Sequence, residues 1–170
     1  MCRKEHDIEN IEPSFKKPDA VLEIPDGERG RLALEDRDWC AVRDAEDTER
    51  HYYLRVLLPV EVLGRTKPCC WGIWVEVSAR HYERAQELWD DPRQSDEPPF
   101  PGRIANRVNG YPDTLGLPGL VSLTDPATIP LFTLDRSISH PLAQEQRDGV
   151  SDERVMEWLM PILHPPRRVD

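Results

Sequence analysis

A histidine, two carboxylates and a tyrosine stand in segments of the sequence where side chains could perform acid–base chemistry. His140 precedes a proline at a predicted helix start, and Glu145 lies about one turn further along. Tyr111 and Asp113 share a turn-forming loop, a kind of segment that often carries function. A histidine that contacts a carboxylate can act as a general base, so His140 with Glu145 or Asp113 would suit a small hydrolase. The alternatives are a structural hydrogen bond at His140 and a capped turn at Asp113.

A second candidate surface lies on the predicted strand over residues 69–78. Side chains alternate along a strand, and one face of this one is apolar throughout. The other face carries Trp74 and Glu76, which we expect to meet solvent, a loop or a ligand. An outward tryptophan is a common anchor in protein interfaces. The alternative is that Trp74 belongs to the core, as most aromatic side chains do.

Metal chemistry is confined to the start of the chain. Cys2 and His6 stand four residues apart and could ligate zinc, although a structural zinc site needs four ligands. A loose N-terminal end is the alternative. The other cysteines, Cys40, Cys69 and Cys70, lie in apolar stretches and are expected to be reduced. We therefore expect no cofactor, with zinc at Cys2 and His6 as the exception to be tested.

Composition bounds the class of protein. The chain has 170 residues, enough for one ordinary domain, and a net charge of -10 at pH 7. An acidic chain is not expected to bind nucleic acid, because neutralising phosphates requires a basic excess. We see neither an apolar run long enough to span a membrane nor a secretory signal, so we expect a cytoplasmic protein. The 17 prolines predict long loops in the second half.

Periodicity and capping residues indicate the elements that must position these side chains. Strands are expected over 39–43, 52–58, 69–78, 102–108, 120–123 and 131–134, and helices over 18–22, 26–34, 79–90, 140–147 and 151–160. Pro161 should end or kink the last helix near Met160, and Pro130 suggests an edge strand. We predict a single α+β domain with a mostly antiparallel sheet, flanking helices and long proline-rich loops. Residues 39–164 would form its main part, after an irregular or helical segment 1–38 and before a tail 165–170.

Four separated motifs give the chain a family resemblance. They are Trp71 to Ser78, Tyr82 to Pro92, Gly110 to Leu115, and His140 to Arg147, in this order. Their order and spacing resemble the bacterial domain-of-unknown-function family 2199, over about residues 39–164. This family has no established activity, so the resemblance supplies no catalytic residues to carry over to this chain.

The same family resemblance gives the N-terminal residues an explanation. Many members begin with a Cys-x-x-Cys-Gly-x-x-His knuckle that looks zinc-binding. Cys2 and His6 match its second cysteine and its histidine, whereas Arg3 replaces the glycine and the first cysteine would fall before Met1. The resemblance therefore implies a knuckle that is degenerate here or cut by a downstream start.

These observations favour a non-catalytic, acidic protein-binding module, immunity- or regulator-like, whose partner could be basic. The chain carries no phosphate loop, dinucleotide fingerprint, His-Glu-x-x-His or Gly-x-Ser-x-Gly motif. An acidic loop with Asp90, Asp91, Asp96 and Glu97 would contribute to the surface. A small hydrolase and a small-ligand sensor that uses the Trp74 face are the alternatives, and the oligomeric state stays open. The candidate binding residues are Trp74, Glu76, Tyr111, Asp113, His140 and Glu145.

Overall fold

The fold is α+β, as predicted. The structure is a computed structural model that describes residues 12–44, 46, 48–126 and 128–163. The strands are β1 Ala33–Glu35, β2 Trp39–Arg43, β3 Arg50–Val60, β4 Cys69–Val77, β5 Phe100–Ile104, β6 Pro118–Ser122 and β7 Leu131–Leu134. The helices are α1 Asp19–Leu22, α2 Asp26–Leu32, α3 Ala79–Leu88, α4 Pro141–Asp148 and α5 Asp152–Leu163, with a 3-10 helix, η2, over Pro92–Asp96.

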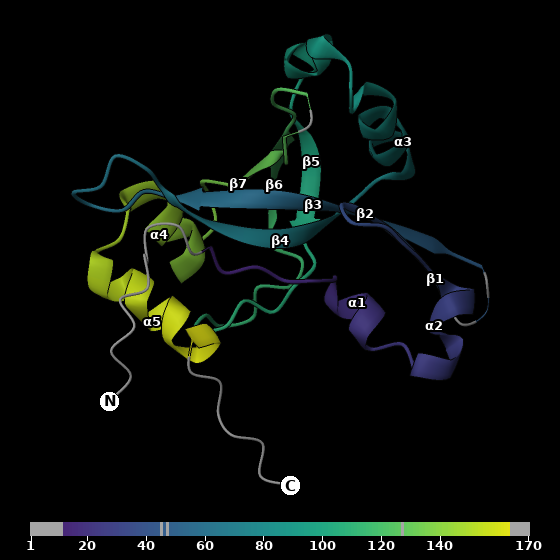
Figure 1. The fold of residues 1–170 in the computed structure, drawn as a ribbon, viewed down its shortest axis with the longest axis horizontal. Coiled ribbons are helices and arrows are strands. Elements are labelled where there is room, and N and C mark those ends of the chain that lie inside the picture. Colours follow the sequence, from purple (N-terminus) through teal and green to yellow (C-terminus); the bar gives the residue numbers. More distant parts are fainter. Residues whose placement is uncertain (1–11, 45, 47, 127, 164–170) are drawn as a thin grey trace, which may run out of the picture.

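The seven strands follow one another in a single sheet, β1 to β7, whose last five strands close on themselves. Neighbours along this order pair antiparallel, and β7 returns to pair with β3 in parallel at Leu57 and Leu131. The long strands β3 and β4 run through the middle of the molecule, and β1 and β2 extend from them toward α1 and α2 (Figure 1). We call the ring of β3 to β7 the closed sheet.

Two paired glycines let the narrow closed sheet hold an aromatic ring. Gly102 pairs with Gly119, and the buried Phe132 lies against both. A side-chain carbon at Gly119 would lie 2.4 Å from the Thr133 carbonyl oxygen and 2.6 Å from the Phe132 ring. Because neither backbone nor ring can yield by that much, a glycine is needed at this position.

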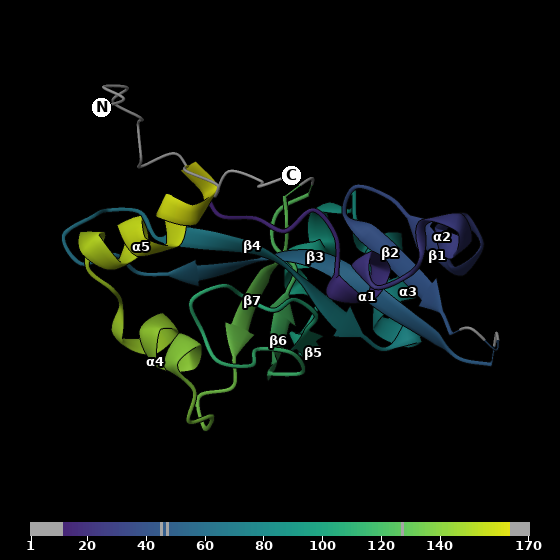
Figure 2. The same ribbon diagram turned by 90° about the horizontal axis from the view of Figure 1, so that it is seen from below.

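The helices cover the sheet from two sides. The main core packs inward-facing strand residues against Leu142 of α4 and Val155 and Leu159 of α5. A smaller core on the other face contains Val21, Cys40, Tyr53 and Trp74. Helix α3 lies away from α4 and α5, across the sheet, in both views (Figures 1 and 2). These two ends of the molecule carry the two regions described below.

An N-terminal segment lies alongside β4 and covers its outer face. The Gly72 amide donates to the Pro13 carbonyl at 2.9 Å, and the Phe15 amide donates to the Gly72 carbonyl at 2.8 Å. A side-chain carbon at Gly72 would lie 2.8 Å from the Ser14 side chain. Gly72 thus permits the close approach of this segment.

Local signals placed several elements correctly. The bounds of β2 and β7 are those predicted, and Ser78 caps α3 by accepting from the His81 amide at 3.3 Å. The turn at Gly149, with a φ of 78°, ends α4 as expected.

Other expectations about the elements are wrong. Residues 33 and 34, expected to continue a helix, instead form β1 with Glu35 because they pair with β2. The strand predicted over 102–108 lies at Phe100–Ile104, and α5 continues past Pro161 to Leu163. Pro130 does not mark an edge, since its carbonyl accepts from the Leu57 amide at 2.8 Å and β7 lies between β6 and β3. Among the described residues, no helix has the length and apolar character needed to span a membrane.

Candidate functional site

Three of the predicted site residues come together where the loop over residues 105–117 meets α4 and α5. The Tyr111 hydroxyl donates to one carboxylate oxygen of Glu145, and Arg154 Nε donates to the other at 2.9 Å. The His140 ring lies 6.5 Å from the Tyr111 ring, centroid to centroid. We call Tyr111, His140, Glu145 and Arg154, with Trp158 beneath them, the tyrosine cluster.

The tyrosine cluster is closed by aromatic packing. The Arg154 guanidinium lies 5.2 Å from the centroid of the Tyr111 ring and 5.8 Å from that of Trp158, within the range of cation–π attraction. Burial, together with the hydrogen bond to the Glu145 carboxylate, raises the pKa of Tyr111 far above its ordinary value. The hydroxyl therefore stays protonated and remains a donor to Glu145.

The acid–base groups of the tyrosine cluster are already engaged. Both carboxylate oxygens of Glu145 have partners, and His140 Nδ1 accepts from the Leu142 amide at 3.1 Å. A neutral imidazole that accepts at Nδ1 carries its proton on Nε2. That Nε2 is buried and has no hydrogen-bond partner among the described residues. What this geometry does is fasten the loop to the two helices.

A buried polar hub holds the base of the same loop. The Asn106 side chain accepts from the Trp74 amide at 2.8 Å and donates to the Lys17 carbonyl at 2.9 Å and to Asp19 at 3.0 Å. The Thr114 hydroxyl donates to the Asn106 carbonyl at 2.7 Å and accepts from the Val108 amide at 2.9 Å. Asn106 is 0 % exposed, and sequence reasoning missed it because its partners are distant in the chain.

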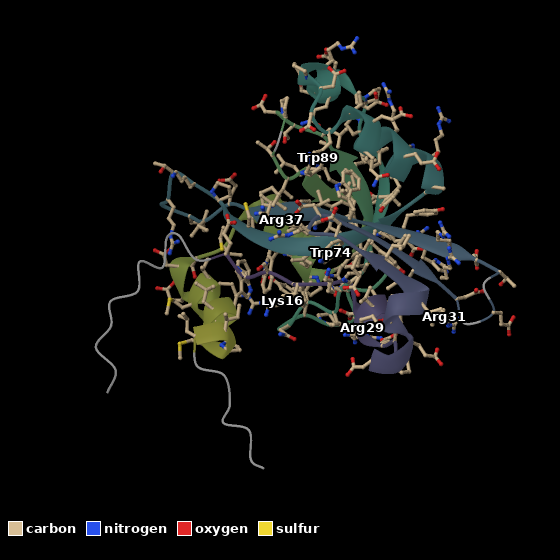
Figure 3. The ribbon with its side chains drawn as sticks, turned by 45° about the vertical axis from the view of Figure 1, so that its right-hand side comes forward. Lys16, Arg29, Arg31, Arg37, Trp74 and Trp89 are labelled. Carbon is tan, nitrogen blue, oxygen red and sulfur yellow. The ribbon has the colours of Figure 1, made fainter. Side chains whose placement is uncertain are left out.

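The remaining predicted residues lie elsewhere. Trp74 is 0 % exposed, and its indole nitrogen donates to the Phe15 carbonyl at 3.2 Å, so it is a core residue rather than an exposed anchor. It lies in the middle of the molecule, whereas Trp89 lies toward the α3 side (Figure 3). Asp113 accepts from the Leu115 amide at 3.2 Å, which is the capped turn given above as the alternative.

The proposed zinc ligands Cys2 and His6 lie outside the described residues, so zinc binding stays a prediction. Within the part of the chain that the structure describes, no three His, Cys, Asp or Glu side chains are grouped to hold a metal. Burial raises the pKa of Cys40 and Cys69 to about 11 and that of Cys70 to about 12. These thiols behave as core residues.

A groove follows α3 on the other side of the sheet. Three hollows of about 500, 440 and 560 Å³ lie in series. The first two share Arg84, Glu87 and Glu97, and the second and third share His81 and Pro101. Helix α3 lines the first hollow together with η2 and the second together with residues 97–101, and the third lies between the end of β4, residues 101–103 of β5 and the start of β6. In Figure 1 this region lies between α3 and the upper end of β5. We call this series the α3 groove.

The α3 groove exists because the β4–β5 ladder stops early. The two strands pair at Glu76 and Arg103, and two residues further along Ser78 would face Pro101. Proline has no amide hydrogen to donate, and the Ser78 carbonyl accepts the first helical hydrogen bond from the Tyr82 amide at 2.9 Å. The strands therefore separate, and Glu76, one of the predicted site residues, lines the hollow between them.

The walls of the α3 groove carry more acid than base. The lining includes six carboxylates and four arginines, namely Glu76, Glu83, Glu87, Asp91, Asp96 and Glu97 with Arg80, Arg84, Arg93 and Arg103. Arg84 crosses the groove to Glu97 at 2.9 Å, and Arg93 binds Asp91 at 2.7 Å. The Arg93 guanidinium lowers the pKa of Asp91 to about 2. Three of the four acidic loop residues predicted to form a binding surface, Asp91, Asp96 and Glu97, thus line this groove, and Asp90 is not among its lining residues.

His81 is the functional candidate that sequence reasoning missed. Its ring stacks on Phe100 with centroids 4.8 Å apart and an interplanar angle of 18°, and its Nδ1 lies 3.0 Å from the Ser78 hydroxyl. It lines both the 440 Å³ and the 560 Å³ hollows. A signal was available, since α3 presents charged residues at helical spacing and is followed by a run of prolines. The spacing did not show that these segments face each other.

The comparisons with known proteins point to one family. Neither the comparison with curated proteins nor that with solved structures found a match. Residues 1–150 match the family described as "Uncharacterized protein conserved in bacteria (DUF2199)", which covers the tyrosine cluster up to α4 and the whole α3 groove. The chain therefore belongs to the bacterial DUF2199 family.

Proposed function

We propose that the protein is a non-catalytic, acidic binding module of the bacterial cytoplasm, immunity- or regulator-like, that holds a segment of a protein partner in the α3 groove. The observation that carries this proposal is the continuity of the three hollows, which share lining residues along the length of α3. An elongated groove suits an extended chain, whereas small-molecule sites are compact and enclosed.

Charge supports a protein partner with a basic segment. The six carboxylates of the groove outnumber its four arginines, and the whole chain carries a charge of -10. Complementary charge steers association and excludes acidic competitors. The proposal moves the binding surface from Trp74, which is buried, to α3 and the acidic residues that follow it.

Site-specific photo-crosslinking in the bacterial cell tests the proposal. A photoreactive amino acid replaces Arg80 on the groove wall in one strain and Arg31 on α2 in a control strain. Both are exposed helical arginines, so they differ mainly in the surface they sample. We expect a discrete protein adduct from position 80 that position 31 does not give. The same adducts at both positions, or none at position 80, would contradict the proposal.

A further inference from the structure

The backbone along one wall of the α3 groove offers hydrogen-bond acceptors and no donors. Residues 98, 99 and 101 are prolines and have no amide hydrogen. The Glu97 amide already donates to the Gln94 carbonyl at 3.1 Å. In the β5–β6 ladder the Ile104 amide donates to the Leu117 carbonyl, so the alternation of an antiparallel pair directs the amides of Phe100 and Gly102 toward β6 as well.

The side chains around the 440 Å³ hollow include two arginines, Arg80 and Arg84, and three glutamates that add further acceptors. Glu83 and Glu87 come from α3, and Glu97 comes from the opposite wall. Arg84 binds only one oxygen of Glu97, Oε2, through its Nε at 3.1 Å and Nη2 at 2.9 Å. The other oxygen of Glu97 and the Glu83 carboxylate make no hydrogen bond or ion pair with another described residue. The hollow therefore holds acceptors that Arg84 does not use.

We infer that the 440 Å³ hollow takes an arginine side chain from the partner segment, an inference that rests on the proposed function. Arginine carries five donors and no acceptor, which complements a wall without donors. Its planar guanidinium binds carboxylates in fixed geometry, and Arg84 shows that Glu87 and Glu97 already accept such a group from one side. The partly exposed His81 ring, supported by Phe100, provides a flat surface beside the hollow.

A peptide titration followed by NMR tests this inference on the full chain. The probe is acetyl-Gly-Ser-Arg-Ser-Gly-amide, and the comparison peptides carry citrulline or lysine in place of arginine. Citrulline keeps the shape and removes the charge. We expect saturable shifts of the His81, Glu97 and Phe100 amides with the arginine peptide, at least about tenfold weaker binding with citrulline, and an intermediate result with lysine.

Matched variants assign the effect to the hollow. Glu83→Gln should weaken binding of the arginine peptide several-fold. Glu28→Gln, which removes an equal charge from an exposed position on α2, should leave this binding unchanged. Equal binding of arginine and citrulline peptides, or shifts confined to other surfaces, would overturn the inference. If position 80 still crosslinks a partner in that case, the groove binds by other chemistry and the proposed function stands. Absence of both results removes both proposals.

Discussion

Arg84 and Arg154 have the same kind of partners and opposite surroundings. Each binds a glutamate three residues further along its own helix, Glu87 for Arg84 and Glu157 for Arg154. Each also binds a glutamate from another element, at 2.9 Å in both cases. Yet the Arg154 side chain is 27 % exposed and lies over two aromatic rings, whereas the Arg84 side chain is 46 % exposed and borders a groove.

This difference between the two arginines indicates which region leaves hydrogen-bond acceptors open to a partner. In the tyrosine cluster, both carboxylate oxygens of Glu145 accept hydrogen bonds from inside the protein, and the Arg154 guanidinium lies over two aromatic rings. In the α3 groove, acceptors remain after Arg84 has paired, and the hollows on either side are open. The same chemical groups thus fasten the fold at one end of the molecule and present a surface at the other.

The largest expected effect is the protection of the Cys69 thiol, which lies in the same core as Trp158 of the tyrosine cluster. A pKa of about 11 for Cys69 reduces its thiolate at pH 8 about 100-fold relative to an ordinary thiol. Iodoacetamide labelling followed by mass spectrometry measures the reactivity of this thiol. Arg154→Met should open the cluster and speed labelling of Cys69, which belongs to the same core as Trp158, whereas Arg84→Met should not. Equal acceleration by both variants would mean that the two regions do not differ as described.

The buried thiols of Cys40 and Cys69 set the sign of an alkaline pH dependence. Because their pKa is raised in the folded protein, they contribute stability that is present below their ordinary value of 9.0 and is lost as the pH rises toward about 11. Urea denaturation across this range should therefore show falling stability. A free energy of unfolding that rises between pH 9 and 11 would contradict this account.

Stability separates the two arginines directly. Arg154→Met removes charge-assisted hydrogen bonds and a cation–π contact from a mostly buried pair, and should lower the free energy of unfolding by about 2 kcal/mol. Arg84→Met removes an exposed pair and should leave the urea midpoint unchanged within error. A larger loss for Arg84→Met than for Arg154→Met would reverse the comparison.

A single hydroxyl gives a smaller test of the tyrosine cluster. Tyr111→Phe removes the hydrogen bond to Glu145 and should cost about 1 kcal/mol. Tyr52→Phe is the matched control, because the Tyr52 ring also packs on an aromatic neighbour but its hydroxyl makes no hydrogen bond to a described residue. Thermal or urea unfolding measures both. Equal effects of the two substitutions would show that the Tyr111 hydroxyl does not hold the loop.

The smallest expected effect concerns Asp91, which lines the α3 groove beside η2. The lowered pKa of Asp91, about 2, means that its pairing with Arg93 is present above the ordinary value of 3.8 and is lost as the pH falls toward 2. Asp91→Asn should flatten the pH dependence of stability in that window, whereas Asp26→Asn at the exposed start of α2 should not. A pH dependence that Asp91→Asn leaves unchanged would count against the ion pair.

Local chemistry explains what the sequence could predict. Ser78, Gly149 and the apolar alternation of β4 act within a few residues, so the start of α3, the end of α4 and the core face of β4 followed from the pattern. Tyr111, His140 and Glu145 were also predicted as site residues because of their chemistry. That they lie close to one another could be learned only from the fold.

Long-range pairing explains the features that the sequence could not predict. The burial of Trp74 depends on the N-terminal segment that lies alongside β4, and β1 forms only because β2 lies beside it. The α3 groove depends on Pro101 ending a ladder between strands that are more than twenty residues apart. A single-sequence pattern contains no information on which distant segments face each other, so the charged spacing of α3 and the prolines after it did not reveal the groove that His81 lines.

We expect the partner to bind the α3 groove and not the tyrosine cluster. One photoreactive amino acid, placed at position 80 of the groove wall or at position 157 beside Arg154, tests this expectation in the same cells and under the same illumination. The account predicts a protein adduct from position 80 that position 157 does not give. An adduct from position 157 with none from position 80 would contradict it.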